Sequence, residues 1–297
     1  MQRSLIALVG VCALGACGND KMHAHRDGPI GPQRWQPKPG ETKNWDIQVS
    51  APFDFSTERQ MMIVDLWTSV PAATTIDYGD GTSVSVPAGA QPQTIATLQA
   101  RQTKIICRVG LGGMRTTDPD AERFPEASRQ VIDPKMPSDE FLLDLADPEP
   151  WQDAAFARID LAAQIGCDGI EPYRIDHFGL DTALSLDDQI AWYARVALEA
   201  HDRDLSVGMR NGLEIYQSQA PSFDWAIIER CAEDNVCDQV RPVLQLRKAV
   251  FALDFNTSFF GDTQDPTLLC NRHDTAGIED GIVKNVELSS AFLMQCP

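Results

Sequence analysis

The sequence predicts an α/β fold, a single (β/α)8 TIM barrel, and three observations lead to this prediction. Apolar runs of strand length alternate with segments of helical periodicity, at a repeat of roughly 30 residues. Most of these runs are continuous rather than alternating, which is typical of strands buried on both faces of a parallel sheet. The length of 297 residues suits one barrel without a second domain.

The first residues have the features of an export signal. Arg3 supplies a short positive region, and the apolar run at residues 5–14 is too short to span a bilayer. The run leads into the tetrapeptide LGAC, which ends at Cys17 and resembles a bacterial lipobox. We therefore expect residues 1–16 to be a signal peptide and Cys17 to be the acylated N-terminus of an exported, cell-envelope lipoprotein. The alternative is an ordinary signal peptide without a lipid.

Residues 17–43 are predicted to form a linker between the lipid anchor and the barrel. Four prolines and four glycines fall within this segment, which has little apolar content. His23 and His25 also lie in it, but two histidines on a flexible tether would make a weak metal site. The barrel is then expected over residues 44–297.

Nine apolar runs are predicted as strands, and four periodic segments are predicted as helices. The strands are expected at Trp45–Val49, Met61–Trp67, Lys104–Gly110, Phe141–Leu145, Gly169–Ile175, Leu205–Asn211, Trp225–Cys231, Ala249–Phe255 and Gly281–Leu288. The helices are expected at Gln93–Gln102, Trp151–Ile165, Leu186–Asp202 and Asp238–Leu246. Ser185 is a suitable N-cap for the third helix. The barrel has eight or nine strands, depending on whether Trp45–Val49 pairs within it.

Residues 74–86 interrupt this alternation. Two β-type arms flank Gly79-Asp80-Gly81, which predicts a hairpin. Because the hairpin follows a barrel strand, it would begin at the C-terminal face, where it either covers a site or packs elsewhere as an addition to the fold.

The cysteines predict two disulfides. Besides Cys12 in the signal and Cys17, six remain: Cys107, Cys167, Cys231, Cys237, Cys270 and Cys296. Export places them in an oxidising compartment. We expect local disulfides between Cys231 and Cys237 and between Cys270 and Cys296, whereas Cys107 and Cys167 lie in or beside apolar runs and are expected to be free, buried thiols. No C-x2-C pair is present, so no metal site is predicted.

The charge of the chain excludes two kinds of partner. Lys plus Arg is 25 against 43 Asp plus Glu, which gives a formal net charge of -18. Nucleic acid and an anionic membrane surface would both repel such a chain. We expect no nucleic-acid partner, membrane association only through the lipid anchor, and a monomer.

Four acidic residues stand near the C-terminal ends of otherwise apolar strands: Asp65, Glu171, Glu229 and Asp254. A carboxylate there is costly to bury unless it is paired with a cation or faces a polar cavity. Barrel enzymes place their chemistry at these strand ends. Two carboxylates with different pKa values are what hydrolysis of a glycosidic bond requires. The alternative is that some of these acids pair with a barrel Arg or Lys.

Motifs for other chemistries are missing from the sequence. It contains no G-x-S-x-G, no P-loop and no G-x-G-x-x-G after a strand, and the glycines of residues 110–113 do not fit the dinucleotide spacing. We therefore expect no cofactor.

The chain resembles glycoside hydrolase family 114, the endo-α-1,4-polygalactosaminidase family, over roughly residues 44–297. The segments that carry the resemblance are NWDIQ at 44–48, IVDLW at 63–67, KIICRVGLGG at 104–113, FLLDL at 141–145, GCDGIEPYRID at 166–176, LEAHDRDLSVGMRN at 198–211, FDWAIIERCAEDNVC at 223–237 and KAVFALDF at 248–255. The resemblance implies a (β/α)8 barrel that hydrolyses an amino-sugar polysaccharide without a metal.

The resemblance also implies which residues contact substrate. The chain matches the family at Asp65, Glu171, Asp176, Asn211 and Glu229. The family usually has Tyr where this chain has Arg108, Asp at Tyr173, Asn at Arg174, Lys at Arg210, Asn at Ile228, Gln at Arg230 and Glu at Asp254. The expected substrate-binding residues are Arg108, Tyr173, Arg174, Asp176, Arg210, Asn211, Arg230 and Asp254. The gained arginines either suit a carboxylate, sulfate or phosphate group or neutralise neighbouring acids.

Our leading hypothesis is a glycoside hydrolase acting on an extracellular or envelope polysaccharide. Glu229 is expected to be the general acid, because packing against Ile227 and Ile228 would raise its pKa. Glu171 is expected to be the ionised nucleophile or base, and Asp65 replaces it if Glu171 is structural; the reversed assignment of the two glutamates stays open. The alternatives are a barrel that binds carbohydrate without cleaving it, which the Tyr at position 173 favours, and a structural lipoprotein without a ligand.

Overall fold

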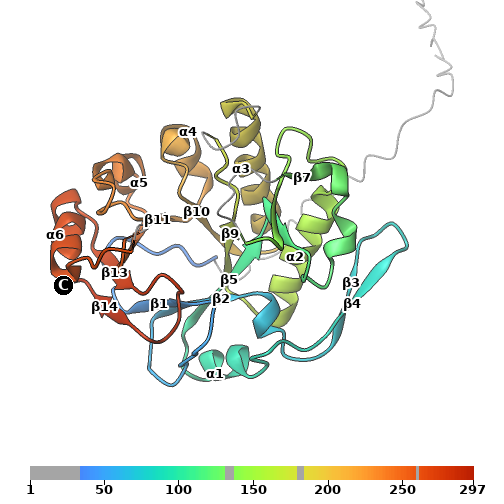
Figure 1. Ribbon diagram of the computed structural model, residues 1–297, viewed down its shortest axis with the longest axis horizontal. Coiled ribbons are helices and arrows are strands. Elements are labelled where there is room, and N and C mark those ends of the chain that lie inside the picture. The colour runs from blue at the N-terminus through green and yellow to red at the C-terminus, as the bar shows by residue number, and fades with distance from the viewer. Residues whose placement is uncertain (1–33, 131–136, 179–183, 259–260) are drawn as a thin grey trace, which may run out of the picture. The chain divides into compact units, whose positions relative to one another are not determined.

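Eight parallel strands form the predicted barrel in the computed structural model, which describes residues 34–130, 137–178, 184–258 and 261–297 (Figure 1). The barrel strands, in spatial order, are β1 (Trp45–Gln48), β2 (Met61–Asp65), β5 (Lys104–Gly110), β9 (Gly169–Tyr173), β10 (Ser206–Arg210), β11 (Trp225–Glu229), β12 (Val250–Phe255) and β13 (Asp280–Lys284). Each of these strands pairs in parallel with its neighbour in this order. The α/β barrel prediction is therefore confirmed.

Side-chain contacts complete the barrel between its first and last strands. A ninth strand, β14 (Leu293–Gln295), pairs antiparallel with β13 at this seam. The Lys284 ammonium lies 2.7 Å from the Asp46 carboxylate, and both side chains are buried. The Val49 amide also donates to the Leu288 carbonyl across the seam, at 2.9 Å. The ends of the chain's barrel region are thus joined by a buried ion pair rather than by a continuous ladder.

One predicted barrel strand belongs to a different sheet. The run at Phe141–Leu145 forms β8 (Glu140–Leu143), which lies between β6 (Gly113–Arg115) and β7 (Arg129–Gln130) in an antiparallel sheet. Assigning it to the barrel was wrong, because a continuous apolar run marks burial on both faces and not the sheet that provides it. Trp45–Val49, by contrast, does pair within the barrel.

Helices cover the outside of the barrel (Figure 1). They are α1 (Thr94–Ala100), α2 (Gln152–Ile165), α3 (Leu186–His201), α4 (Tyr216–Gln219), α5 (Arg241–Gln245) and α6 (Pro266–Ala276), with short 3-10 turns at 67–69, 121–123, 126–128, 213–215, 220–222 and 237–240. Ser185 caps α3 as predicted and accepts from the Asp188 amide at 3.1 Å. Helix α6 was not predicted, although Asp265 caps it, Pro266 begins it and left-handed Gly277 ends it. None of the helices in the described ranges is long and apolar enough to cross a bilayer.

The apolar core has two layers, and strand alternation decides which layer each side chain enters. Residues such as Met62 and Val64 of β2 face the helices, whereas Met61 and Ile63 face the barrel interior. The interior cluster comprises Trp45, Ile47, Met61, Ile63, Ile106, Trp225, Ile227, Ala249, Phe251, Leu253, Ile282 and Leu288. The same alternation points the last inward side chain of each strand into the C-terminal mouth of the barrel.

Three disulfides lie within the described residues. The predicted pairs Cys231–Cys237 and Cys270–Cys296 are both present. The prediction that Cys107 and Cys167 are free was wrong, because they form the third disulfide, with their Cα atoms 5.9 Å apart. Cys107 faces outward from β5, and Cys167 lies just before the adjacent β9, so neighbouring strands bring together residues 60 positions apart.

The last part of the predicted linker is packed on the barrel. The Trp35 ring stacks on Phe251 with a centroid distance of 6.3 Å, and the Gln36 amide donates to Asp224 at 2.8 Å. Residues 34–43 therefore differ from the free linker that their proline and glycine content predicts. The predicted signal peptide, Cys17, His23 and His25 lie outside the described residues.

The hairpin β3 (Thr74–Asp77) and β4 (Ser83–Val86) forms as predicted and packs on the outside of the barrel. Gln164 of α2 donates to the Thr74 hydroxyl at 2.9 Å, and Arg123 pairs with Asp80 at the hairpin tip at 2.8 Å. Figure 1 shows the hairpin beyond α2, at the edge of the molecule. It is an addition to the helical layer rather than a cover over the barrel mouth.

Candidate active site

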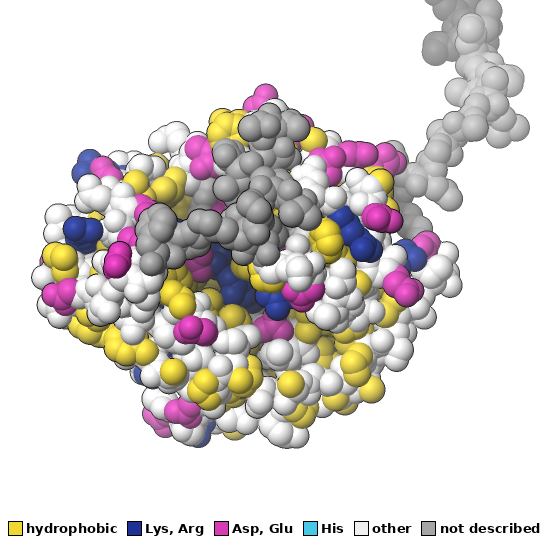
Figure 2. Space-filling model, in the orientation of Figure 1, with side chains coloured by type: hydrophobic (Ala, Val, Ile, Leu, Met, Phe, Trp, Pro, Cys, Tyr) yellow, Lys and Arg dark blue, Asp and Glu magenta, His cyan; other side chains and the backbone are white. Residues whose placement is uncertain are grey.

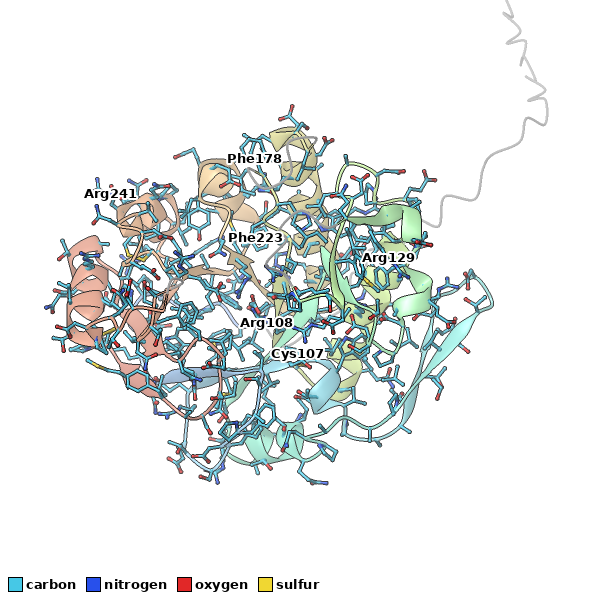
Figure 3. All side chains as sticks on the ribbon, in the orientation of Figure 1. Cys107, Arg108, Arg129, Phe178, Phe223 and Arg241 are labelled. Atoms are coloured by element: carbon cyan, nitrogen blue, oxygen red, sulfur yellow. A yellow bond between two sulfur atoms is a disulfide. The ribbon has the colours of Figure 1, made fainter. Side chains whose placement is uncertain are left out.

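A cavity of about 270 Å³ opens at the C-terminal ends of β2, β5 and β9. Its lining is Val49, Asp65, Trp67, Thr68, Arg108, Gly110, Gly113, Met114, Arg115, Thr117, Asp118, Pro119, Glu140, Arg158 and Tyr173. Figure 2 shows Lys and Arg side chains inside the hollow at the centre of this face, and Figure 3 places Arg108 near the barrel centre. The cavity is therefore polar and rich in guanidinium groups.

An alternating row of charges crosses the barrel mouth. Glu171 is fully buried and pairs with Arg210, while its other oxygen lies 3.2 Å from Arg108 Nε. Arg210 also pairs with Glu229, so that one guanidinium bridges two carboxylates. Glu171 is thus enclosed between two arginines, whereas the Glu229 side chain keeps 20% of its surface exposed.

The backbone fixes where these side chains point. Arg174, Asn211 and Arg230 follow directly after the last residues of β9, β10 and β11, and all three have positive φ angles of 57°, 44° and 61°. Such left-handed backbone is costly for residues other than glycine. It turns the chain sharply at each strand end, so the preceding side chains Tyr173, Arg210 and Glu229 stay directed into the mouth.

Asp65 is a cavity carboxyl whose environment favours the protonated form. Burial raises its pKa, although the Thr68 amide donates to it at 2.9 Å and Arg108 lies nearby. A protonated carboxyl at the strand end is able to donate a proton to a bound substrate.

The pKa of Glu229 shifts in the opposite direction to that of Asp65. Burial acts to raise its pKa, but Arg210 and Arg108 outweigh burial, and the net pKa is lowered. The expected general-acid role, which relied on a pKa raised by Ile227 and Ile228, is therefore not supported. The sequence argument missed the pairing because Arg210 comes from the neighbouring strand β10.

Tyr173 connects this row of charges to a further carboxylate, that of Glu140. Arg108 stacks over its ring at 3.9 Å, and its hydroxyl donates to Glu140 at 3.2 Å. Glu140 also accepts from Arg174 at 2.7 Å. Burial raises the pKa of Tyr173 despite the surrounding arginines, so the phenol remains protonated and acts as a donor.

The comparison with protein families identifies the chain. The model of glycoside-hydrolase family GH114 matches residues 26–296. The chain belongs to family GH114. This membership makes it an O-glycosidase by family, and the strand ends described above are where such barrels carry their chemistry.

Solved structures show the same fold for this GH114 chain. The crystal structure of Aspergillus fumigatus Ega3 in complex with galactosamine superimposes with a TM-score of 0.71 at 24% identity, covering 91% of this chain and 100% of Ega3. The glycoside hydrolase domain of PelA from Pseudomonas aeruginosa superimposes with a TM-score of 0.59 at 12% identity, covering 85% of this chain and 97% of that domain. A search of curated proteins found no match.

Asp176 and Asn211 lie behind the GH114 carboxylates rather than in the cavity lining. The Asn211 side chain donates to Asp176 at 2.9 Å and accepts from the Glu229 amide at 2.9 Å. Burial raises the pKa of Asp176. This pair therefore fixes the backbone that presents Glu229.

Two of the expected substrate-binding residues point away from the cavity of this GH114 barrel. Asp254 is fully buried and accepts from His273, at 2.7 Å, and from the amides of Ala232 and Glu233. It has outward parity in β12, because Leu253 belongs to the interior cluster. Arg230 pairs with Glu233 and Asp234. Both residues hold the loop after β11.

Three cavity residues were not foreseen: Glu140, Arg115 and Arg158. Arg158 of α2 pairs with Asp118 and Asp120 at 3.0 and 2.7 Å and donates to the Gly110 carbonyl. These contacts of the Arg158 guanidinium hold the loop beside the cavity. A buried arginine within a helix is a signal for such a role, since Arg is seldom buried without partners.

Proposed function

We propose that this GH114 chain hydrolyses O-glycosidic bonds of an extracellular or envelope polysaccharide of the amino-sugar type, with Asp65 and Glu229 as the working carboxylates. The observation that supports the pair is the opposite direction of their pKa shifts, raised for Asp65 and lowered for Glu229. Opposed shifts of this kind separate the acid from the base in glycosidases. The galactosamine complex of Ega3 supports the substrate class.

In this mechanism the protonated Asp65 delivers its proton to the glycosidic oxygen as the bond to the anomeric carbon breaks. The ionised Glu229 faces the positive charge that develops on the sugar, as nucleophile or as base for the attacking water. Arg210 holds Glu229 ionised, and Glu171 positions Arg210 and Arg108 from behind. Glu171 thus becomes a positioning residue, Glu229 takes the nucleophile or base role first expected of Glu171, and Asp65 takes the acid role first expected of Glu229.

The first prediction concerns the two carboxylates. Asp65→Asn and Glu229→Gln should each slow cleavage of an amino-sugar polysaccharide by about 100-fold or more, because each removes a proton-transfer or nucleophilic group. Reducing-end release measures cleavage, and circular dichroism checks folding. Asp202→Asn, at an exposed position, is the control and should leave the cleavage rate unchanged. Near-normal turnover in either folded variant would refute the pair, and binding without cleavage by the unchanged protein would favour the carbohydrate-binding alternative.

We further propose that the protein is an exported lipoprotein anchored through Cys17. The short apolar segment ending in LGAC supports this proposal. Expressed in a bacterial host, the mature protein should begin at Cys17 and carry acyl chains, as intact-mass and N-terminal peptide spectrometry would show. Cys17→Ala should abolish acylation. A mature N-terminus without lipid would contradict the anchor.

A further inference from the structure

Arg108 is a nearly buried cation whose hydrogen-bonding capacity is unused. Its side chain is 10% exposed and lines the cavity. Arg108 Nε lies 3.2 Å from Glu171 as an ion pair, yet the contact lacks hydrogen-bond alignment, and Nε has no hydrogen-bond partner among the described residues. Tyr173 supports one face of the guanidinium at 3.9 Å. The buried Nε faces Glu171, while the rest of the guanidinium, which forms no hydrogen bond within the described residues, lines the cavity and can donate to an acceptor that comes from outside the chain.

Arg115 supplies a second guanidinium to the same cavity. Its side chain is 52% exposed, and its nearest carboxylate oxygen, on Glu140, is 3.5 Å away. The guanidinium donates no hydrogen bond within the described part of the chain, unlike Arg158 and Arg174, whose donors are engaged by carboxylates. Arg108 and Arg115 therefore face the cavity from β5 and β6 with donors available.

The cavity acids do not cancel this positive charge. Asp118 is held by Arg158, and burial raises the pKa values of both Asp65 and Asp118. Glu140, the third acid of the lining, pairs with Arg174 at 2.7 Å. An ammonium group placed here would meet two guanidinium groups whose donors are open to the cavity, and the like charges would repel it.

We propose that the sugar unit bound in this cavity carries a carboxylate, which Arg108 and Arg115 hold, so that the substrate is an acidic polysaccharide. The proposal rests on the proposed function and narrows its substrate class: a uronic or N-acylated amino-uronic acid unit satisfies the site, whereas a unit with a free amine does not. A planar carboxylate matches the fork of guanidinium donors better than a single polar hydroxyl does. Sulfate shares this charge, and the test below separates the two.

The test compares ligands that differ only in charge. Calorimetry would measure binding of trigalacturonic acid, its methyl ester, a sulfated galactose trimer and a galactosamine trimer to the purified protein. We expect the acid to bind at least about 10-fold more tightly than its ester and than the other two trimers. Equal binding of acid and ester, including no binding of either, overturns the proposal, as does tightest binding of the galactosamine or sulfated trimer.

Variants assign the preference to residues. Arg115→Gln and Arg108→Gln should each bring acid and ester to within a few-fold of one another, while Arg195→Gln, at an exposed position on α3, should keep the preference. Because Arg115 is half-exposed, its variant remains informative if Arg108→Gln does not fold. If Arg115→Gln still binds the acid much more tightly than the ester, the assignment of this preference to Arg115 is refuted. Tight binding of the acid without cleavage of any polymer would overturn only the proposed function, whereas cleavage of galactosaminan without preference for acid would overturn only this inference.

Discussion

Arg210 determines the ionisation of the barrel mouth, since its guanidinium bridges Glu171 and Glu229. Replacing it changes the charge on Glu229 without touching the substrate-facing cavity, whose lining does not include Arg210. This residue therefore separates two effects that are usually mixed in active-site variants: loss of contact and change of protonation.

The pH dependence of kcat/KM is the prediction that follows. Activity needs ionised Glu229, whose pKa is lowered from 4.5, and protonated Asp65, whose pKa is raised from 3.8. Activity should be lost as pH falls through the pKa of Glu229 and as pH rises through that of Asp65, giving a bell. Arg210→Gln should move the acid limb to higher pH, and Arg210→Lys should leave it nearly in place. An acid limb that stays fixed in Arg210→Gln would contradict this role.

Sequence reasoning identified site residues only where their position along one strand was sufficient. Asp65, Glu171 and Glu229 were recognised as acids at strand ends, and all three lie at the barrel mouth. Alternation would also have separated Asp254 from them, because it follows inward-facing Leu253. Glu140 could not be foreseen, since its role depends on a small antiparallel sheet whose strand β8 was predicted to belong to the barrel.

Among the elements, the seam between β1 and β13 contains a buried ion pair between Asp46 and Lys284. Asp46→Asn should destabilise the protein by about 3–5 kcal/mol, because it leaves the Lys284 ammonium buried without a counter-charge. Urea unfolding would measure the loss. The double variant Asp46→Leu/Lys284→Met, which removes both charges, should lose less than the single variant does. Equal stability of Asp46→Asn and the unchanged protein would show that the pair does not hold the seam.

Apolar runs predicted where the strands form, but they did not predict which sheet each strand joins. The eight barrel strands all coincide with predicted runs, whereas Phe141–Leu145 had the same pattern and formed β8 of the antiparallel sheet. Helix α6 was missed because its apolar periodicity is weak, although its termini carry Asp265, Pro266 and Gly277. Capping residues would have located it when periodicity did not.

For the molecule as a whole, the Cys107–Cys167 disulfide closes the longest of the three covalent loops, 60 residues against 6 and 26. Removing it with the double variant Cys107→Ser/Cys167→Ser should cost about 3–4 kcal/mol and lower Tm by roughly 5–15 °C. The matched variant Cys231→Ser/Cys237→Ser should cost less, about 2 kcal/mol, because its loop is short. Thermal unfolding followed by circular dichroism measures both. An unchanged Tm in Cys107→Ser/Cys167→Ser would contradict the stabilising role of this disulfide.

The left-handed residues that follow β9, β10 and β11 also bear on how such a barrel can evolve. The backbone turn, and not the preceding side chain, sets the direction at each strand end. The side chain at position 173, 210 or 229 is therefore directed into the barrel mouth whatever its type. A different side chain at one of them changes the chemistry displayed in the mouth while the scaffold beneath stays the same. Selection for a new substrate can therefore proceed at positions 173 and 210 by exchanging side chains without rebuilding loops.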